Sequence, residues 1–195
     1  KTQVTLTSTQ MGQAGVSAAL VGKPALSAVL VTFAADASSA RIGSGDLTVD
    51  KTTIVSSGTD AARYTAVVKD ANGNPVAHQQ VNWTSNLGKL SDATSVTNVN
   101  GEATVTFTGT TVGSAQIIAA VNGNPANAPR VNIVADAASA RLDSGDLTAN
   151  KTSALANGSD SVSYTARVID AAGNLVSGVT VGWSSDRGTL SSAAS

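Results

Sequence analysis

The sequence predicts an all-β protein made of tandem immunoglobulin-like β-sandwich domains of about 100 residues each. Three features of the 195-residue chain lead to this prediction. The chain repeats itself at a shift of about 100 positions. Short runs of β-branched and apolar residues alternate with turns rich in Gly, Asn and Pro. A tryptophan stands in a middle run, where a sandwich of this kind has its core.

The repeat defines three segments. SGDLTVDKT at 44–52 returns as SGDLTANKT at 144–152, and the match continues around it without a gap. Near the start of the chain the shift is 101, because one residue is missing from the first copy. We therefore expect residues 1–35 to be the C-terminal strands of one repeat, 36–135 a complete repeat, and 136–195 the N-terminal strands of the next.

Five runs in the complete copy are expected to be strands with one apolar face toward the core. Their inward residues are Tyr64, Ala66 and Val68; Val81 and Trp83; Ala103, Val105 and Phe107; Ile117, Ala119 and Val121; and Val131 and Ile133. Between several runs lie Asn-Gly turns, which supply positive φ at tight hairpins. Helices are not expected, because no apolar stripe with a period of 3.6 residues persists.

Composition excludes several classes of function. The chain has no cysteine, so disulfides, thiolate zinc sites and cysteine nucleophiles are absent. Its 12 basic and 13 acidic residues are scattered and give a net charge of −1, so no nucleic-acid partner is expected. No apolar run reaches the roughly 18 residues of a membrane-spanning helix, so this segment should not insert into a membrane. Aromatic residues are only 3%, so Ala and Val must fill most of the core.

A set of motifs makes the prediction more specific. They are Leu47-Thr48, Gly58-Thr59-Asp60, Asp70 followed by Gly73-Asn74-Pro75-Val76, and Val81 with Trp83. With these motifs the chain resembles the bacterial Ig-like repeat domains of the invasin/intimin family of outer-membrane adhesins, the inverse autotransporters. The third copy departs from the pattern only at Leu175, where the family would have Pro. The resemblance implies an extracellular, surface-exposed position, anchored to a bacterial outer membrane through a region outside these residues.

The segment from Asp70 to Asn74 could be either a metal site or a turn. Asp70, Asn72 and Asn74 are spaced like the first ligands of a calcium loop. However, the glycine stands at position four instead of six, and no Glu closes the loop at position twelve. The third copy has Ala172 in place of Asn72. We therefore favour a hairpin turn and expect neither a metal nor another cofactor.

The remaining candidates also favour structural roles. His78 is the only histidine, and we expect it on a solvent-facing strand position, not in a catalytic site. Gly58-Thr59-Asp60 lacks the Arg of an integrin-binding triplet and recurs at 158–160, so it is interpreted as a turn. Trp83 and Trp183 could stack on a sugar, but alternation beside an inward valine favours the core. No constellation for catalysis is present, and we do not expect an enzyme.

Two functions remain open after these exclusions. The first is a stalk or spacer module that displays an adhesive tip away from the outer membrane, with neighbouring repeats as its partners. The second is a binding module in which one copy contacts a host glycoprotein or antibody, with the surface around His78-Gln79-Gln80 as its candidate site. Nearly identical loops in the two copies favour the spacer. We expect the copies to form an extended rod, since no flexible linker joins them.

The two ends of the chain suggest a further contact. Residues 1–35 and 136–195 each lack the strands that the other holds, and only six repeat positions, VTNVNG in the complete copy, are absent from both. A half-sandwich exposes strand edges and an apolar face. The head of one molecule is therefore expected to complete the tail of another by strand addition. The alternative is that the chain is one period of a longer array.

Overall fold

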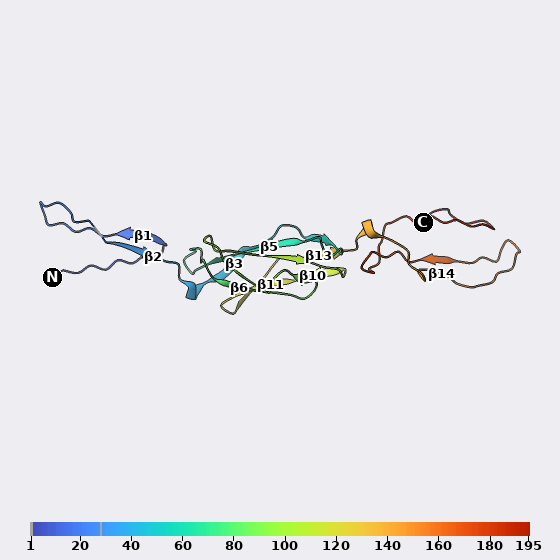
Figure 1. Cartoon of the computed structure of the whole chain (residues 1–195), viewed down its shortest axis with the longest axis horizontal. Coiled ribbons are helices and arrows are strands. Elements are labelled where there is room, and N and C mark those ends of the chain that lie inside the picture. Colours follow the sequence, from blue (N-terminus) through green and yellow to red (C-terminus); the bar gives the residue numbers. More distant parts are fainter. Residues whose placement is uncertain (1, 28) are drawn as a thin grey trace.

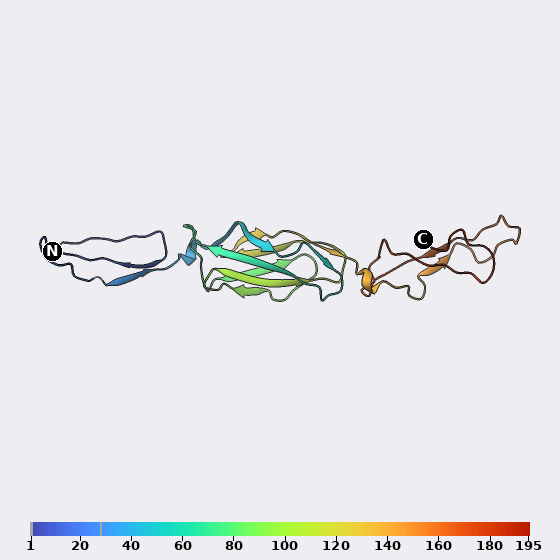
Figure 2. The same cartoon turned by 90° about the horizontal axis from the view of Figure 1, so that it is seen from above.

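A computed structural model describes residues 2–27 and 29–195 of the chain. The molecule is elongated, with three segments laid end to end (Figures 1 and 2). The N-terminus belongs to the segment at one end and the C-terminus to the segment at the other. Among the described residues, no helix has the length and apolar character needed to cross a membrane.

The middle segment is a β-sandwich. One four-stranded sheet has the order β3-β5-β9-β7, with bounds Arg41–Val49, Ala62–Lys69, Glu102–Thr108 and Lys89–Leu90. The facing sheet has the order β12-β11-β6-β8, with bounds Asn124–Asn127, Ile117–Val121, Gln80–Ser85 and Thr94–Val96. A three-stranded sheet has the order β10-β13-β4, with bounds Gly113–Ala115, Val131–Val134 and Thr53–Val55. This confirms the all-β, immunoglobulin-like fold.

The core follows the alternation in the sequence. All five expected runs form strands, namely β5, β6, β9, β11 and β13. Every residue that was expected to face inward is buried. Trp83 on β6 lies opposite Ala119 on β11, and its indole Nε1 donates a hydrogen bond to Ser95 Oγ at 2.8 Å. The prediction that Trp83 fills the core is therefore confirmed, with one polar partner for its N–H.

The two outer segments are more open. The first contains a hairpin, β1 (Gly12–Gly15) with β2 (Leu30–Phe33), and the last contains β14 (Leu147–Ala149) paired with β15 (Tyr164–Ala166). Equivalent residues differ sharply in burial. Tyr64 is fully buried, whereas Tyr164 is 56% exposed, and Leu47 is 7% exposed, whereas Leu147 is 57% exposed. The same residue types thus form a core only where both sheets surround them.

The outer segments also expose apolar side chains without closing on each other. Within one molecule they lie at opposite ends (Figure 1). The exposed residues of the first segment include Val4, Leu20, Leu26 and Val29. Pairing of these segments between two molecules, and the division of the chain at residues 36 and 136, stay predictions.

Candidate functional site: the junction between repeats

The connector between the middle and last segments is short and ordered. Strand β13 ends at Val134, and the 3-10 helix η2 (Ala137–Ser139) begins almost at once. Asp136 caps this helix, because its carboxylate accepts a hydrogen bond from Ala138 N at 3.1 Å. The same arrangement occurs one repeat earlier, where Asp36 caps η1 (Ala37–Ser39). The chain therefore passes from one repeat to the next through a capped turn.

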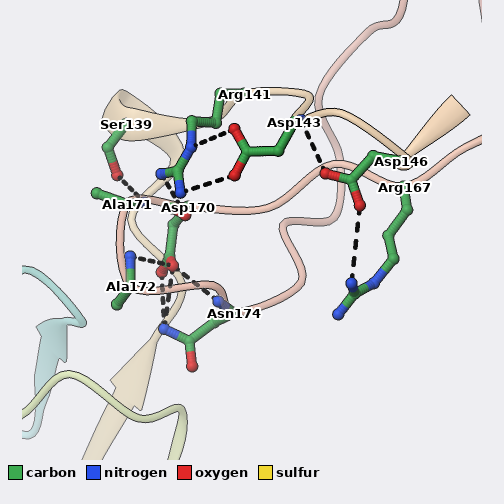
Figure 3. Close-up of polar contacts among 9 residues, drawn as sticks. All are labelled: Ser139, Arg141, Asp143, Asp146, Arg167, Asp170, Ala171, Ala172 and Asn174. Atoms are coloured by element: carbon green, nitrogen blue, oxygen red, sulfur yellow. Dashed lines mark hydrogen bonds and ion pairs between the residues drawn. The ribbon is translucent and has the colours of Figure 1, made fainter.

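A second turn is held against this connector by Asp170. One carboxylate oxygen, Oδ1, accepts hydrogen bonds from the backbone N–H groups of Ala172 at 2.9 Å and Asn174 at 2.8 Å. The other oxygen, Oδ2, accepts from the N–H of Asp136 at 3.2 Å. Ser139 Oγ accepts from Ala171 N at 3.1 Å on the other side of the turn (Figure 3). The turn and the helix thus form one hydrogen-bonded unit.

Asp70 builds the same unit at the first junction. Its Oδ1 accepts from the N–H groups of Asn72 and Asn74, both at 2.9 Å, and its Oδ2 accepts from Asp36 N at 3.1 Å. These donors occupy the carboxylate in the manner of a hairpin turn, as the sequence predicted. Only the backbone of Asn72 takes part, since its side chain is exposed and Ala172 takes its place in the next copy.

Asn174 carries the contact across the junction. Its Nδ2 donates to the backbone oxygen of Thr110 at 2.8 Å, and its Oδ1 accepts from Val112 N at 3.2 Å. Thr110 and Val112 belong to the preceding repeat. One amide side chain therefore binds two main-chain groups of its neighbour, which makes the contact insensitive to the neighbour's side chains.

The first junction has an equivalent clamp. Asn74 Nδ2 donates to Thr9 O at 2.9 Å, and Met11 N donates to Asn74 Oδ1 at 3.1 Å. Thr9 and Met11 stand 101 positions before Thr110 and Val112, in agreement with the shift of the early repeat. The clamp is thus built twice in one chain from the same residue type.

Ser56 adds a contact at the second junction. Its Oγ donates to Asp170 Oδ2 at 2.5 Å, and Asp136 N donates to Ser56 Oγ at 3.2 Å. Ser56 is 2% exposed and Asp170 is 1% exposed, so this hydrogen bond is shielded from water. Sequence reasoning missed Ser56. Comparison of the copies gave no signal for it, because the equivalent residue is Ala156.

Both junction carboxylates are tuned to remain charged. Hydrogen bonds, chiefly from the Asn74 side chain, lower the pKa of Asp70 to about 2. Burial raises the pKa of Asp170, but hydrogen bonds from Ser56 and Asn174 outweigh it, and the net pKa lies well below the usual range. At neutral pH both groups therefore act as fixed acceptors.

Arg141 supports the last segment beside the junction. Its Nη1 donates to the backbone oxygen of Asp170 at 2.7 Å, and its guanidinium pairs with Asp143 at 2.8 Å (Figure 3). This pairing raises the pKa of Arg141. A longer pair joins Arg167 to Asp146 at 3.7 Å. The Arg141–Asp143 pair is exposed and adds little stability.

Two further aspartates of the middle repeat bind backbone groups of their own copy. Asp60 accepts from Val55 N at 2.9 Å and pairs with Lys51. Asp50 accepts from Arg63 N at 2.8 Å. Gly58 has φ of 77° and Gly158 has φ of 75°, so both copies form the same turn. The interpretation of Gly58-Thr59-Asp60 as a structural turn is confirmed.

His78 corrects one detail of the sequence analysis. It is exposed, as expected, but it lies in a turn before β6 and not on a strand. Its φ is 58°, a left-handed conformation in which glycine is favoured, and the equivalent Gly178 has φ of 75°. Both copies therefore share a left-handed backbone at this position, which suits the glycine of the third copy. The side chain of Gln79 contacts the turn between β11 and β12, where its Nε2 donates to Asn122 Oδ1 at 3.1 Å.

The comparisons with known proteins agree with this fold. The model of the family described as bacterial Ig-like domain (group 1) matches residues 44–134 and 144–195. The inverse autotransporter adhesin YeeJ of Escherichia coli K12 is 32% identical over 201 aligned positions, which cover 98% of this chain and 8% of that protein. Intimin of Escherichia coli O127:H6 is 42% identical over 123 positions, covering 63% of this chain and 13% of intimin.

A solved structure with a similar fold is that of invasin, described as a bacterial integrin-binding protein. It matches 90% of this chain and 36% of its own chain with a TM-score of 0.60 and 24% identity, a likeness of fold alone. The chain thus spans only a small part of the length of its adhesin relatives.

Proposed function

Because the chain belongs to the family of bacterial Ig-like domains (group 1), we propose that its repeats are stalk modules of a bacterial surface adhesin, which hold an adhesive tip away from the outer membrane. The observation that carries this proposal is the repeated junction. Asn74 and Asn174 make the same contact to the preceding repeat, while Asp70 and Asp170 hold the equivalent connector residues, Asp36 and Asp136, of their own repeats. A protein that gains length by adding copies needs such a standard joint.

The geometry suits a spacer in two ways. The core of the middle repeat is made from its own residues, so a further copy adds length without changing the core of its neighbour. The joint consists of hydrogen bonds between an asparagine amide and main-chain groups, together with a capped turn. Such a joint fixes the direction of the next repeat through directional hydrogen bonds.

The partners in this proposal are neighbouring repeats, and the place of action is the outside of the cell. The relatives named adhesins support this position, and the family and fold are those of adhesin domains and not of enzymes. Direct contact with a host-cell protein is the competing function. Its candidate surface is His78-Gln79-Gln80, where the third copy has Gly178-Val179-Thr180 on the same left-handed turn at position 178.

The experiment measures the stiffness of the junctions in the whole chain. Small-angle scattering of the 195-residue protein should give a narrow, rod-like distance distribution. The N74A/N174A double variant should broaden this distribution, because both clamps to the preceding repeat are lost. N72A is the matched control, since Asn72 lies in the same turn and is exposed, and the third copy has alanine there. It should scatter like the wild type.

Two results would contradict the stalk proposal. The first is a flexible distribution in the wild type or an unchanged one in N74A/N174A. The second is saturable binding of the chain to host cells that is lost when residues 78–80 are replaced by Gly-Val-Thr from the third copy. That second result would make the chain a binding module.

A further inference from the structure

Ser56 has a position that the rest of the junction does not explain. It follows β4, and its backbone N–H donates to Val134 O at 2.8 Å, at the end of β13. Its side chain points out of its own repeat and donates to Asp170 of the next. One residue therefore touches the last strand of its own copy, the connector at Asp136, and the turn of the following copy.

The carboxylate of Asp170 does not need Ser56 to be satisfied. It already accepts from Ala172 N, Asn174 N, Asp136 N and the Asn174 side chain. A hydroxyl at position 56 is thus an added hydrogen bond to a charged group in a buried place, and such bonds are among the stronger ones in proteins. The first junction shows that the turn forms with the Asp70 carboxylate on the same backbone donors.

The copies differ at this position. The complete copy has Ser56, and the next copy has Ala156, which has no hydroxyl to donate. The neighbouring residues of the turn serve the same role in both copies, since Asp60 and Asp160 make the same bonds to the backbone and to a lysine. Alanine in place of serine therefore removes a hydrogen bond from the junction and leaves the turn of its own copy intact.

We propose that position 56 of the repeat sets the stiffness of the junction to the following copy, with serine locking the joint and alanine leaving it looser. The inference rests on the proposed stalk function and specifies how one joint differs from another. Ser56 is a positioning residue: it holds Asp170 and Asp136 together. A stalk whose copies carry either residue then has stiff and compliant joints along its length.

The test follows the backbone amide of Asp136 by NMR hydrogen exchange in the whole chain. In S56A this amide loses one of its two acceptors, and the joint loses a buried bond to a charged group. Its exchange should become about tenfold faster. The amide of Asp36 is an internal control in the same molecule, since it donates to Asp70 at 3.1 Å and does not touch Ser56. Its exchange should not change.

Two further variants separate the explanations. S44A removes a hydroxyl from an exposed position of β3 and should leave both amides unchanged. S56T keeps a hydroxyl and should restore slow exchange at Asp136. The Trp83 indole resonance reports in each sample that the core is folded, so faster exchange in an unfolded protein would be recognised.

The outcomes distinguish the inference from the function. If the wild type protects Asp136 and S56A protects it equally, the role of Ser56 is wrong while the stalk proposal stands. If neither Asp36 nor Asp136 is protected in the wild type, the ordered joint itself fails, and both proposals fall with it.

Discussion

Replacement of Trp83 by alanine tests whether the core is complete only in the middle repeat. Trp83 is 2% exposed and lies against β11, where Ala119 is its cross-strand partner. Trp183 occupies the same repeat position but is only half-buried. Its indole also donates to a serine, Ser195, at 2.9 Å, so the two tryptophans share a hydrogen bond and differ in their surroundings.

W83A is expected to lose a large part of the free energy of unfolding. Truncation of a buried aromatic residue to alanine costs about 3–5 kcal/mol. A domain of this size has only about 5–15 kcal/mol of stability to lose. Each kcal/mol shifts the midpoint of thermal unfolding by about 4–8 °C, so W83A should melt at least about 12 °C below the wild type. W183A should cost less than about 1 kcal/mol, because that side chain has little packing to lose.

Circular dichroism melts and urea titrations of both variants measure the difference. The urea titration of W83A should keep the same slope with a lower midpoint. A W83A midpoint within a few degrees of the wild type would show that Trp83 is not a core residue, and the sugar-stacking interpretation would return. Equal losses in W83A and W183A would refute the reasoning differently, since residues 136–195 would then have a closed core in solution.

Three further outcomes are expected. In a urea titration, G88A should destabilise the middle repeat by more than about 1 kcal/mol. Gly88 has a φ of 71°, and a Cβ at this position would lie 2.5 Å from a backbone oxygen. G188A should cost less, because a Cβ at Gly188 would meet no atom within 4 Å. H78G should stabilise the chain by up to about 1 kcal/mol in the same assay, since it removes a left-handed non-glycine residue. The Asp70 carboxyl should titrate near pH 2 by NMR. Because its pKa is lowered, its contribution to stability should be full above about pH 4 and lost as the pH falls toward 2. Titration near pH 4 would contradict the hydrogen-bond network at the first junction.

Much of the sandwich could be predicted because its signal is local. Alternation placed Tyr64, Val105 and Ile117 on the inward face, and one buried face per strand fixes that assignment. Strand β3 was missed, since Gly43 and Gly45 interrupt its pattern and its register shifts between Ile42 and Leu47. His78 was placed on a strand because sequence alone does not reveal a positive φ at a residue other than glycine.

The junction was harder to predict than the core. Asp70 and Asn74 were recognised as parts of a turn, which is a local property. The contacts of Asn74 to Thr9 and Met11 join residues more than 60 positions apart and use main-chain atoms of the partner, which have no sequence signature. Ser56 was invisible for a related reason: its acceptor, Asp170, stands 114 positions away in the next copy.

The parallel pairing of β4 with β13 determines how the middle repeat would bear a pull on its two ends. Strand β4 lies near the start of the repeat and β13 at its end, and they run side by side over Asn132–Val134. Tension along the chain would slide these strands past each other, so that their hydrogen bonds are loaded in shear and must break together. Ser56 extends this pair, since its N–H donates to Val134 O, and its hydroxyl donates to Asp170 of the next repeat. Mechanical load would thus pass from the middle repeat to the next through the residue that follows its parallel strand pair.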